Sequence, residues 1–442
     1  MTTIDTLRFA TAGSVDDGKS TLVGRLLHDS KSVLTDQLEA VERASASRGQ
    51  DTPDLALLTD GLRAEREQGI TIDVAYRYFA TARRRFILAD TPGHVQYTRN
   101  MVTGASTAEL AIILVDARHG VVEQTHRHAA VAALLRVPHV VLAVNKMDLV
   151  GYEQKDFERI VEDFAGHAAE LDLPGFTPIP VSALCGDNVV ERSAHMDWYE
   201  GPALLEFLET VPVGSEPTSA PARFPVQYVI RHGEVRHYAG QLVSGTLRVG
   251  DRVTVHPSGE TSEIVGIDVL GRDAGLAYAP QSLTLRLADQ RDVSRGDMIT
   301  AGPDAPALTH DVRAAVCHLA DRALRVGDRV LVKHTTRTVK AIVKDLGGVD
   351  ELTANDLGRI ALRTAEPLAL DDYADVRRTG AFLLVDPADG STLTAGMADL
   401  SPGRPGRLRH QGPAFGRPQV PSESRGLGAS VRPVCGRRLP AR

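Results

Sequence analysis

The sequence predicts an α/β domain, with a mostly parallel sheet and helices on both faces, followed by two antiparallel β-barrels. In the first half of the chain, short apolar runs alternate with helical stretches, which is typical of a parallel sheet covered by helices. Residues 211–222 (VPVGSEPTSAPA) have the Pro-, Ser- and Gly-rich composition of a linker. Beyond them the pattern is short strands separated by turns, which indicates two barrels of roughly 90 residues each.

The expected elements of the α/β domain follow this alternation. Strands are expected at Leu7–Thr11, Phe86–Ala89, Ala111–Val115, Val140–Val144 and Thr177–Val181, and helices at Thr21–Leu27, Tyr97–Gly104, Glu123–Leu135 and Glu153–Leu171. Ile72–Thr81 precedes the second strand across a short turn, so these two segments are expected to form an antiparallel hairpin within the sheet.

The barrel half is expected to divide at a second Pro-containing break, Gly302–Pro306. The strands expected on either side of it are Phe224–Arg231, Gln241–Val243, Arg252–His256, Ser262–Asp268 and Leu283–Leu287, then Val312–Leu319, Arg329–His334, Thr338–Lys344, Arg359–Thr364 and Ala381–Val385. The resulting domains are residues 1–213, 221–303 and 308–399, with residues 400–442 as an Arg-, Pro- and Gly-rich tail.

The tail is chemically unlike the rest of the chain. Residues 401–442 contain nine Arg and one Glu, a balance of +8, together with seven Pro and seven Gly. A basic arm can attract nucleic acid. This composition instead favours a disordered or aberrantly read extension, because it offers little to pack. The tail does not resemble the end of a barrel, which leaves open whether the third domain has all of its strands.

Composition and charge exclude several classes of protein. The net charge is −7, so the residues before the tail carry −15, which argues weakly against binding nucleic acid. No apolar run approaches the roughly 18 residues that span a bilayer, and the N-terminus does not resemble a secretory signal. Cys185, Cys317 and Cys435 lie far apart, so neither a disulfide framework nor a structural zinc site is expected. A reducing cytoplasm fits best.

A phosphate-binding loop is expected between the first strand and the first helix. The pattern GxxxxGK[ST] is met by Gly13, Ser14, Val15, Asp16, Asp17, Gly18, Lys19 and Ser20. Its glycines let backbone N–H groups curve around phosphates, and the helix N-terminus continuing through Thr21 adds positive potential. Lys19 is one of only seven Lys among 50 basic residues. We expect it to reach the β- and γ-phosphates, and the Ser20 hydroxyl to bind Mg²⁺.

Two further segments are expected to respond to the γ-phosphate. The first follows a strand and consists of Asp90, Thr91, Pro92, Gly93 and His94. Asp90 can hold Mg²⁺ through water, and Gly93 offers a backbone N–H near the γ-phosphate. His94 is placed to orient the attacking water, although most of the 15 histidines have packing or surface roles.

The second segment is GITI, which contains Thr71. A Thr hydroxyl there can complete the Mg²⁺ shell only when triphosphate is present, so hydrolysis would release the loop. GITI is a weak signal alone, and its position between the phosphate-binding loop and DTPGH strengthens it.

A base-recognition loop is expected after the strand Val140–Val144. It consists of Asn145, Lys146, Met147 and Asp148, and it is completed by Ser182, Ala183 and Leu184 after the last strand. The Asp148 carboxylate can accept two hydrogen bonds from guanine, whereas adenine has no such donor pair. Lys146 can lie along the base and ribose, and Asn145 can tie this loop to the phosphate-binding loop. The motifs in this order select GTP over ATP.

These motifs together resemble the translation-factor class of GTPases, and the order of domains resembles that of elongation factor Tu. Longer stretches are similar more specifically to the large, GTP-binding subunit of bacterial sulfate adenylyltransferases. They are residues 66–79, 96–108, 120–125, 186–190 and 198–202, then 224–229, 238–240, 355–358 and 378–386 in the barrels. The resemblance covers about residues 5–398.

The resemblance implies a heteromeric complex with GTP and Mg²⁺ as cofactors. In it, a small catalytic subunit transfers AMP from ATP to sulfate, giving adenosine 5′-phosphosulfate and pyrophosphate, and this chain hydrolyses GTP to drive that step. The residues themselves reveal nothing of sulfate. They do fit the division of labour, because the chain contains no second phosphate loop and no Ser-Gly-Gly ATP-pyrophosphatase motif. The tail also lacks the phosphate loop of the sulfate-activating kinase domain fused in some relatives.

Two other hypotheses stay open on the sequence alone. One is an elongation-factor-type GTPase that binds aminoacyl-tRNA, and the other is a non-enzymatic scaffold stabilised by its nucleotide. Retention of tRNA would support the first, and absence of turnover would support the second. No arginine is marked as an arginine finger, so intrinsic GTP hydrolysis is expected to be slow.

Overall fold

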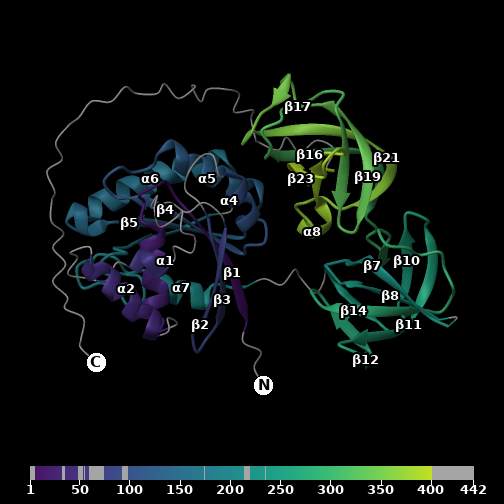
Figure 1. The fold of residues 1–442 in the computed structure, drawn as a ribbon, viewed down its shortest axis with the longest axis horizontal. Helices are drawn as coiled ribbons and strands as arrows, with labels where there is room; N and C mark the ends of the chain where they lie inside the picture. The colour runs from purple at the N-terminus through teal and green to yellow at the C-terminus, as the bar shows by residue number, and fades with distance from the viewer. Residues whose placement is uncertain are drawn as a thin grey trace. The chain divides into compact units, whose positions relative to one another are not determined.

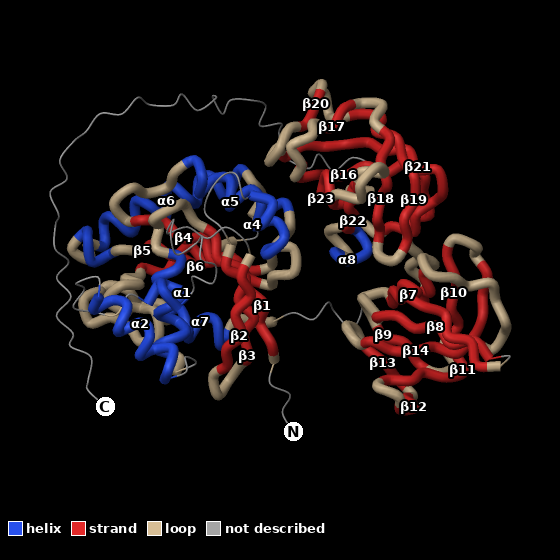
Figure 2. Tube along the Cα trace, viewed as in Figure 1, coloured by secondary structure: helices blue, strands red, loops and turns tan. Residues whose placement is uncertain are grey.

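The chain folds into two compact units that divide between Val213 and Gly214. The computed structural model describes residues 5–31, 35–47, 53, 55–58, 74–91, 98–173, 175–213, 220–233 and 235–400. Figure 1 shows the fold, and Figure 2 shows that the first unit mixes helices and strands whereas the second is built mainly of strands.

The first unit contains a six-stranded sheet in the order β2-β3-β1-β4-β5-β6. The strands are β1 (Thr6–Ala12), β2 (Ala75–Ala80), β3 (Arg85–Asp90), β4 (Leu110–Asp116), β5 (His139–Asn145) and β6 (Thr177–Pro180). All neighbours are parallel except β2 and β3, which form the expected antiparallel hairpin. Every residue of β4 is buried, as befits an apolar run in the middle of a sheet that is covered on both faces.

Helices lie on both faces of this sheet (Figure 1). They are α1 (Lys19–Asp29), α2 (Thr35–Ser47), α4 (Thr98–Ala105), α5 (Glu123–Leu134), α6 (Gln154–Glu170) and α7 (Leu204–Thr210), with short 3₁₀ turns at Leu55–Leu58 and Met147–Val150. Leucines of α1 and α7 share one apolar core with the sheet, whereas α4, α5 and α6 contact β1, β4 and β5. The sequence analysis missed α2 and α7. The sequence of α2, TDQLEAVERASAS, contains only two large apolar residues, Leu38 and Val41, too few to give a helical apolar period.

The second unit begins with a closed barrel of six strands. Its strands and short additions are β7 (Ala222–His232), β8 (Val235–Gln241), β9 (Thr246–Arg248), β10 (Arg252–His256), β11 (Glu260–Val269), β12 (Arg272–Ala274), β13 (Leu276–Tyr278), β14 (Ser282–Leu287) and β15 (Met298–Ala301). The ring runs β10-β15-β7-β8-β14-β11 and closes through β10 and β11.

The expected strand Gln241–Val243 is wrong, because β8 ends where that segment begins. Gly240 lies inside β8. A Cβ at this position would come within 2.4 Å of the Pro225 carbonyl oxygen, so the glycine is needed for close approach to β7 rather than for a turn. The hairpin turn lies earlier, at Gly233, which has a φ of +61°.

The second barrel is also closed, in the order β16-β21-β19-β18-β22-β23. Its elements are β16 (Ala307–His318), β17 (Leu324–Arg325), β18 (Arg329–His334), β19 (Arg337–Asp345), β20 (Glu351–Leu352), β21 (Leu357–Leu370), α8 (Arg377–Gly380), β22 (Ala381–Val385) and β23 (Thr392–Ala398). The sequence left the completeness of this barrel open. The six strands settle it, because β23 pairs with both β16 and β22 and so closes the ring.

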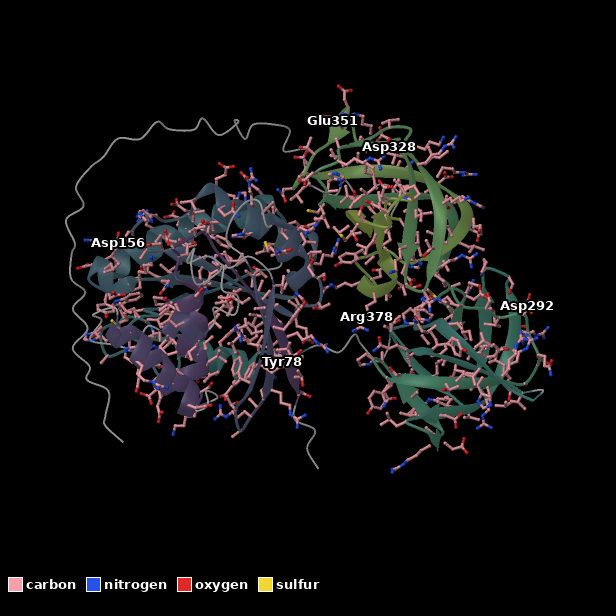
Figure 3. The ribbon with its side chains drawn as sticks, viewed as in Figure 1. Tyr78, Asp156, Asp292, Asp328, Glu351 and Arg378 are labelled. Carbon is pink, nitrogen blue, oxygen red and sulfur yellow. The ribbon has the colours of Figure 1, made fainter. Side chains whose placement is uncertain are left out.

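A buried ion pair joins the two barrels. Arg223 of β7 is 1% exposed, and its guanidinium donates two hydrogen bonds, of 2.8 and 2.9 Å, to the Asp371 carboxylate that follows β21. The Thr379 hydroxyl donates a third, of 2.6 Å, to the same carboxylate. At the rim of this joint, Arg378 of α8, labelled in Figure 3, donates to the Gln241 side chain at 3.1 Å.

Among the described residues, none of the helices combines the length and apolar character needed to cross a membrane.

Candidate guanine-nucleotide site

Five loops meet at the carboxyl edge of the sheet in the first unit. Residues 13–18 follow β1, Asp90 ends β3, Asp116 ends β4, Asn145 ends β5 and Ser182 follows β6. Because parallel strands direct their carboxyl ends to the same edge, the fold brings these loops together. The site residues expected from the sequence that the structure describes all lie on these loops or at the start of α1.

Backbone geometry shapes the first of these loops. Gly18 immediately precedes α1 with a φ of +90°, and a Cβ there would come within 2.5 Å of the Asn145 Nδ2 atom. Glycine is therefore needed for both conformation and space. The Asp17 side chain turns into the loop, where its Oδ2 accepts a 2.5 Å hydrogen bond from the Ser14 N–H. Burial raises the pKa of Asp17 above its ordinary value.

Lys19 lies inside the loop rather than in solvent. Its side chain is 7% exposed, and Nζ donates to the carbonyl oxygens of Gly13 at 2.8 Å and Ser14 at 2.7 Å. Burial lowers the pKa of Lys19, and the carboxylates of Asp90 and Asp17 act in the opposite direction. A buried cation whose hydrogen bonds to the described residues go to carbonyl oxygens is well placed to take phosphate oxygens as partners.

Asp90 is positioned by the neighbouring strand. It lies opposite Thr11 in the β1–β3 pairing, and the Thr11 hydroxyl donates to its Oδ1 at 2.9 Å. Asp90 is 2% exposed, and Ser20 is half-buried in the first turn of α1. The Thr91 hydroxyl donates to the Thr11 carbonyl at 2.5 Å, so Thr91 is fixed to the strand rather than directed at a ligand. Thr71, Pro92, Gly93 and His94 lie outside the described residues.

Asn145 ties the base loop to the phosphate loop. Its Nδ2 donates to the Asp17 carbonyl at 2.7 Å, and its Oδ1 accepts from the Ala183 N–H at 2.9 Å. One side chain therefore bridges three segments that are remote in sequence. Lys146 reaches the same loop, because its Nζ donates to the Asp16 carbonyl.

Asp148 and Ser182 complete the base loop. The Ser182 hydroxyl donates to the Asp148 Oδ1 at 2.6 Å, which orients the carboxylate. Met147 is buried beneath, whereas Leu184 is 46% exposed. Arg25 of α1 donates to the carbonyls of Ala183 and Leu184 at 3.2 and 2.5 Å, which fixes the segment after β6.

The sequence analysis missed Asp116 and Arg118. Asp116 is 2% exposed, and its carboxylate forms a 2.9 Å ion pair with the Lys146 ammonium. The Arg118 guanidinium donates to both oxygens of Asp116, at 3.1 and 2.7 Å. Burial would raise the pKa of Asp116, but the hydrogen bonds from Arg118 and Lys146 outweigh it and hold the pKa far below its ordinary value. An Asp that ends an apolar strand, as Asp90 does, was the signal available.

Comparison with known proteins agrees with this fold. The elongation factor Tu GTP binding domain family matches residues 5–213, and the GTP-eEF1A C-terminal domain-like family matches residues 311–399. The fold and the site therefore define a GTPase of the elongation factor Tu type.

Relatives along most of the chain narrow the class. Sulfate adenylyltransferase subunit 1 of Cellvibrio japonicus is 47% identical over 405 residues, which cover 88% of this chain and 86% of that protein. The same subunit of Bacteroides fragilis is 47% identical over 407 residues, 89% of this chain and 86% of its own. The bifunctional enzyme CysN/CysC of Mycobacterium tuberculosis is 54% identical over 415 residues, 90% of this chain and 67% of that protein. The chain belongs to the sulfate adenylyltransferase subunit 1 family.

Proposed function

We propose that this chain is the GTP-hydrolysing subunit of a cytoplasmic sulfate adenylyltransferase complex. GTP hydrolysis here drives the formation of adenosine 5′-phosphosulfate and pyrophosphate from ATP and sulfate, in a small catalytic subunit that binds this chain. The observation that carries the nucleotide half of the proposal is Asn145, whose amide bridges the Asp17 carbonyl and the Ala183 N–H. It holds the base-reading carboxylate of Asp148 at a fixed place relative to the phosphate loop. The partner and the sulfate chemistry rest on the family.

The residues divide into three roles in this proposal. Gly13–Thr21 cradle the phosphates, with Lys19 as their buried cation. Asn145, Lys146, Asp148 and Ser182–Leu184 read the guanine. Thr71, Gly93 and His94 respond to the γ-phosphate, and His94 orients the attacking water. This last role rests on the sequence motif.

The residues near Lys19 fit a magnesium ion. Ser20 offers a hydroxyl and Asp90 a carboxylate, and hard oxygen donors of this kind are those that Mg²⁺ prefers. Asp90 is held by the Thr11 hydroxyl at 2.9 Å, so its carboxylate is oriented before any ion arrives. When bound, Mg²⁺ supplies charge stabilisation to the phosphates. Thr71 is proposed as the third contributor.

The proposal is tested by reconstituting the complex with a purified small subunit. Adenosine 5′-phosphosulfate is measured in the presence of ATP and sulfate, with and without GTP. We expect formation to rise with GTP, and GTP hydrolysis to rise with the small subunit present. His94→Ala should reduce that hydrolysis and leave GTP binding intact.

The proposed function would be contradicted if GTP changed neither the rate nor the extent of adenosine 5′-phosphosulfate formation. Retention of tRNA by the purified chain would instead support the elongation-factor hypothesis. Hydrolysis that is unchanged in His94→Ala would remove the assigned role of His94.

A further inference from the structure

Asp116 and Arg118 form a charged cluster beside the base-reading loop that none of the assigned roles uses. Asp116 ends β4, and its neighbour across the sheet is Asn145, the last residue of β5. A buried carboxylate at this edge is costly unless it is paired. Among the described residues its partners are the cations Lys146 at 2.9 Å and Arg118 at 2.7 Å, and the Nδ1 atom of His119 lies farther away, at 3.6 Å.

Lys146 itself is held in an unusual conformation. Its φ of +65° and ψ of +35° lie in the left-handed region, which non-glycine residues rarely adopt. Such a conformation persists where surrounding contacts fix it. The described contacts of the Lys146 ammonium are two, the Asp116 carboxylate and the Asp16 carbonyl of the phosphate loop.

Arg118 stands on the solvent side of the cluster, with a side chain that is 43% exposed. Its guanidinium forms a two-pronged contact with Asp116, at 3.1 and 2.7 Å, and its own backbone N–H donates a third bond at 2.9 Å. The negative charges of Asp148 and Asp16 also attract the Arg118 guanidinium. Arg118 therefore fixes the direction of the Asp116 carboxylate and offsets the negative charge of Asp148 and Asp16.

We propose that Asp116 is a positioning residue of the guanine-nucleotide site, which sets Lys146 across the base loop and the phosphate loop and thereby sets how long the nucleotide stays bound. Arg118 supports it by orienting its carboxylate. Arg118 orients Asp116, and Asp116 in turn orients Lys146. Of these three residues, only Lys146 contacts the nucleotide. The inference rests on the proposed nucleotide site.

The test measures release of fluorescently labelled GDP from the full chain in the presence of Mg²⁺. Asp116→Asn keeps the shape of the side chain and removes its charge, and we expect release to be faster by a factor on the order of ten, as for one lost charge-assisted hydrogen bond. Arg118→Ala, at a half-exposed position, should change release in the same direction by a smaller factor. Asp156→Asn is the matched control, because Asp156 lies on α6 in a long 3.7 Å ion pair with Arg159 (Figure 3).

The same substitution in a Lys146→Ala background separates positioning from a general effect on the fold. If Asp116 acts through Lys146, Asp116→Asn should alter release there by less than about twofold. An equal acceleration in both backgrounds would overturn the proposal, as would unchanged release in the single variants. If Asp116→Asn does not fold, Arg118→Ala decides alone: faster release supports the proposal and unchanged release overturns it. Failure of the unaltered chain to bind GDP would remove the proposed nucleotide site itself.

Discussion

The two units of the chain bury charged side chains in opposite ways. In the first unit, the buried charges Lys19, Asp90 and Asp116 lie at the carboxyl edge of the sheet, at the start of α1 and the ends of β3 and β4. In the second, Arg223 and Asp371 face each other between two barrels, and the Thr379 hydroxyl supports the carboxylate. The three buried charges of the first unit belong to the proposed nucleotide site, whereas the pair in the second unit joins two parts of the same chain.

The two units also differ in how burial affects the free energy of the charged groups. Burial disfavours the charged form of Lys19 and lowers its pKa. An anionic ligand would stabilise that charged form. In the second unit the Arg223 guanidinium has its counter-charge, the Asp371 carboxylate, within the same fold. Removing Lys19 should therefore affect binding more than folding, and removing Arg223 should affect folding more than binding.

The largest effect is expected for Arg223→Met. It leaves the Asp371 carboxylate buried without its cation, and loss of one partner of such a pair costs about 3–5 kcal/mol of unfolding free energy. The double variant Arg223→Met/Asp371→Leu should recover most of that loss, because both charges are gone. Chemical denaturation followed by circular dichroism measures both variants.

Trp198 provides the control for that experiment. It is the single tryptophan of the chain and lies in the first unit, where its Nε1 donates to the Tyr152 carbonyl at 2.9 Å. Its fluorescence should report an unchanged transition in Arg223→Met. A shift of the Trp198 transition as large as that of the barrels would contradict the separation of the two units.

The next largest effect is expected for Lys19→Ala, and it concerns the affinity for GDP rather than the free energy of unfolding. Hydrogen bonds to charged groups are worth about 1.5–3 kcal/mol each, so GDP affinity should fall by a factor on the order of 100 or more. Calorimetry with GDP and Mg²⁺ measures this, and Lys155→Ala, at a position 76% exposed, is the matched control. Normal GDP binding by Lys19→Ala would refute the phosphate loop.

The effect that is smallest over a single pH unit concerns His128 of α5. Burial lowers the pKa of His128 to about 3, from 6.5 in an unfolded chain. Between these values the unfolded chain binds the extra proton, so the unfolding free energy should fall as the pH falls from 6.5, by about 1.4 kcal/mol per unit. His128→Gln should lose that part of the slope, and exposed His195→Gln should keep it. Identical slopes in all three proteins, followed by Trp198 fluorescence, would count against a buried neutral His128.

The sequence predicted the parts of the fold whose patterns are local. The buried run of β4 and the hairpin of β2 and β3 were foreseen, because apolar period and turn chemistry lie within a few residues. The strand expected at Gln241–Val243 was wrong, because the extent of β8 depends on its pairing with β7, where Gly240 lies against the Pro225 carbonyl of the other strand. The closure of the last barrel depends on β23 meeting β16, which no local pattern contains.

The same limit applies to the site. Lys19, Asp90, Asn145 and Asp148 could be proposed from the sequence because each belongs to a motif with fixed spacing, and the structure brings them to one edge of the sheet. Asp116 belongs to no such motif, and its role depends on Lys146, which is 30 residues away in sequence and 2.9 Å away in space. Motifs predict the residues that contact a ligand, and the fold is needed to find those that hold them.

The most direct test of the account exchanges the nucleotide that drives the reaction. In a complex with the small subunit, Asp148→Asn should lose the pairing with guanine and accept xanthine instead. The account predicts that this variant forms adenosine 5′-phosphosulfate with xanthosine triphosphate and no longer with GTP, while the unaltered chain does the reverse. Stimulation by GTP that is equal in both proteins would contradict the claim that this site reads guanine and drives the partner.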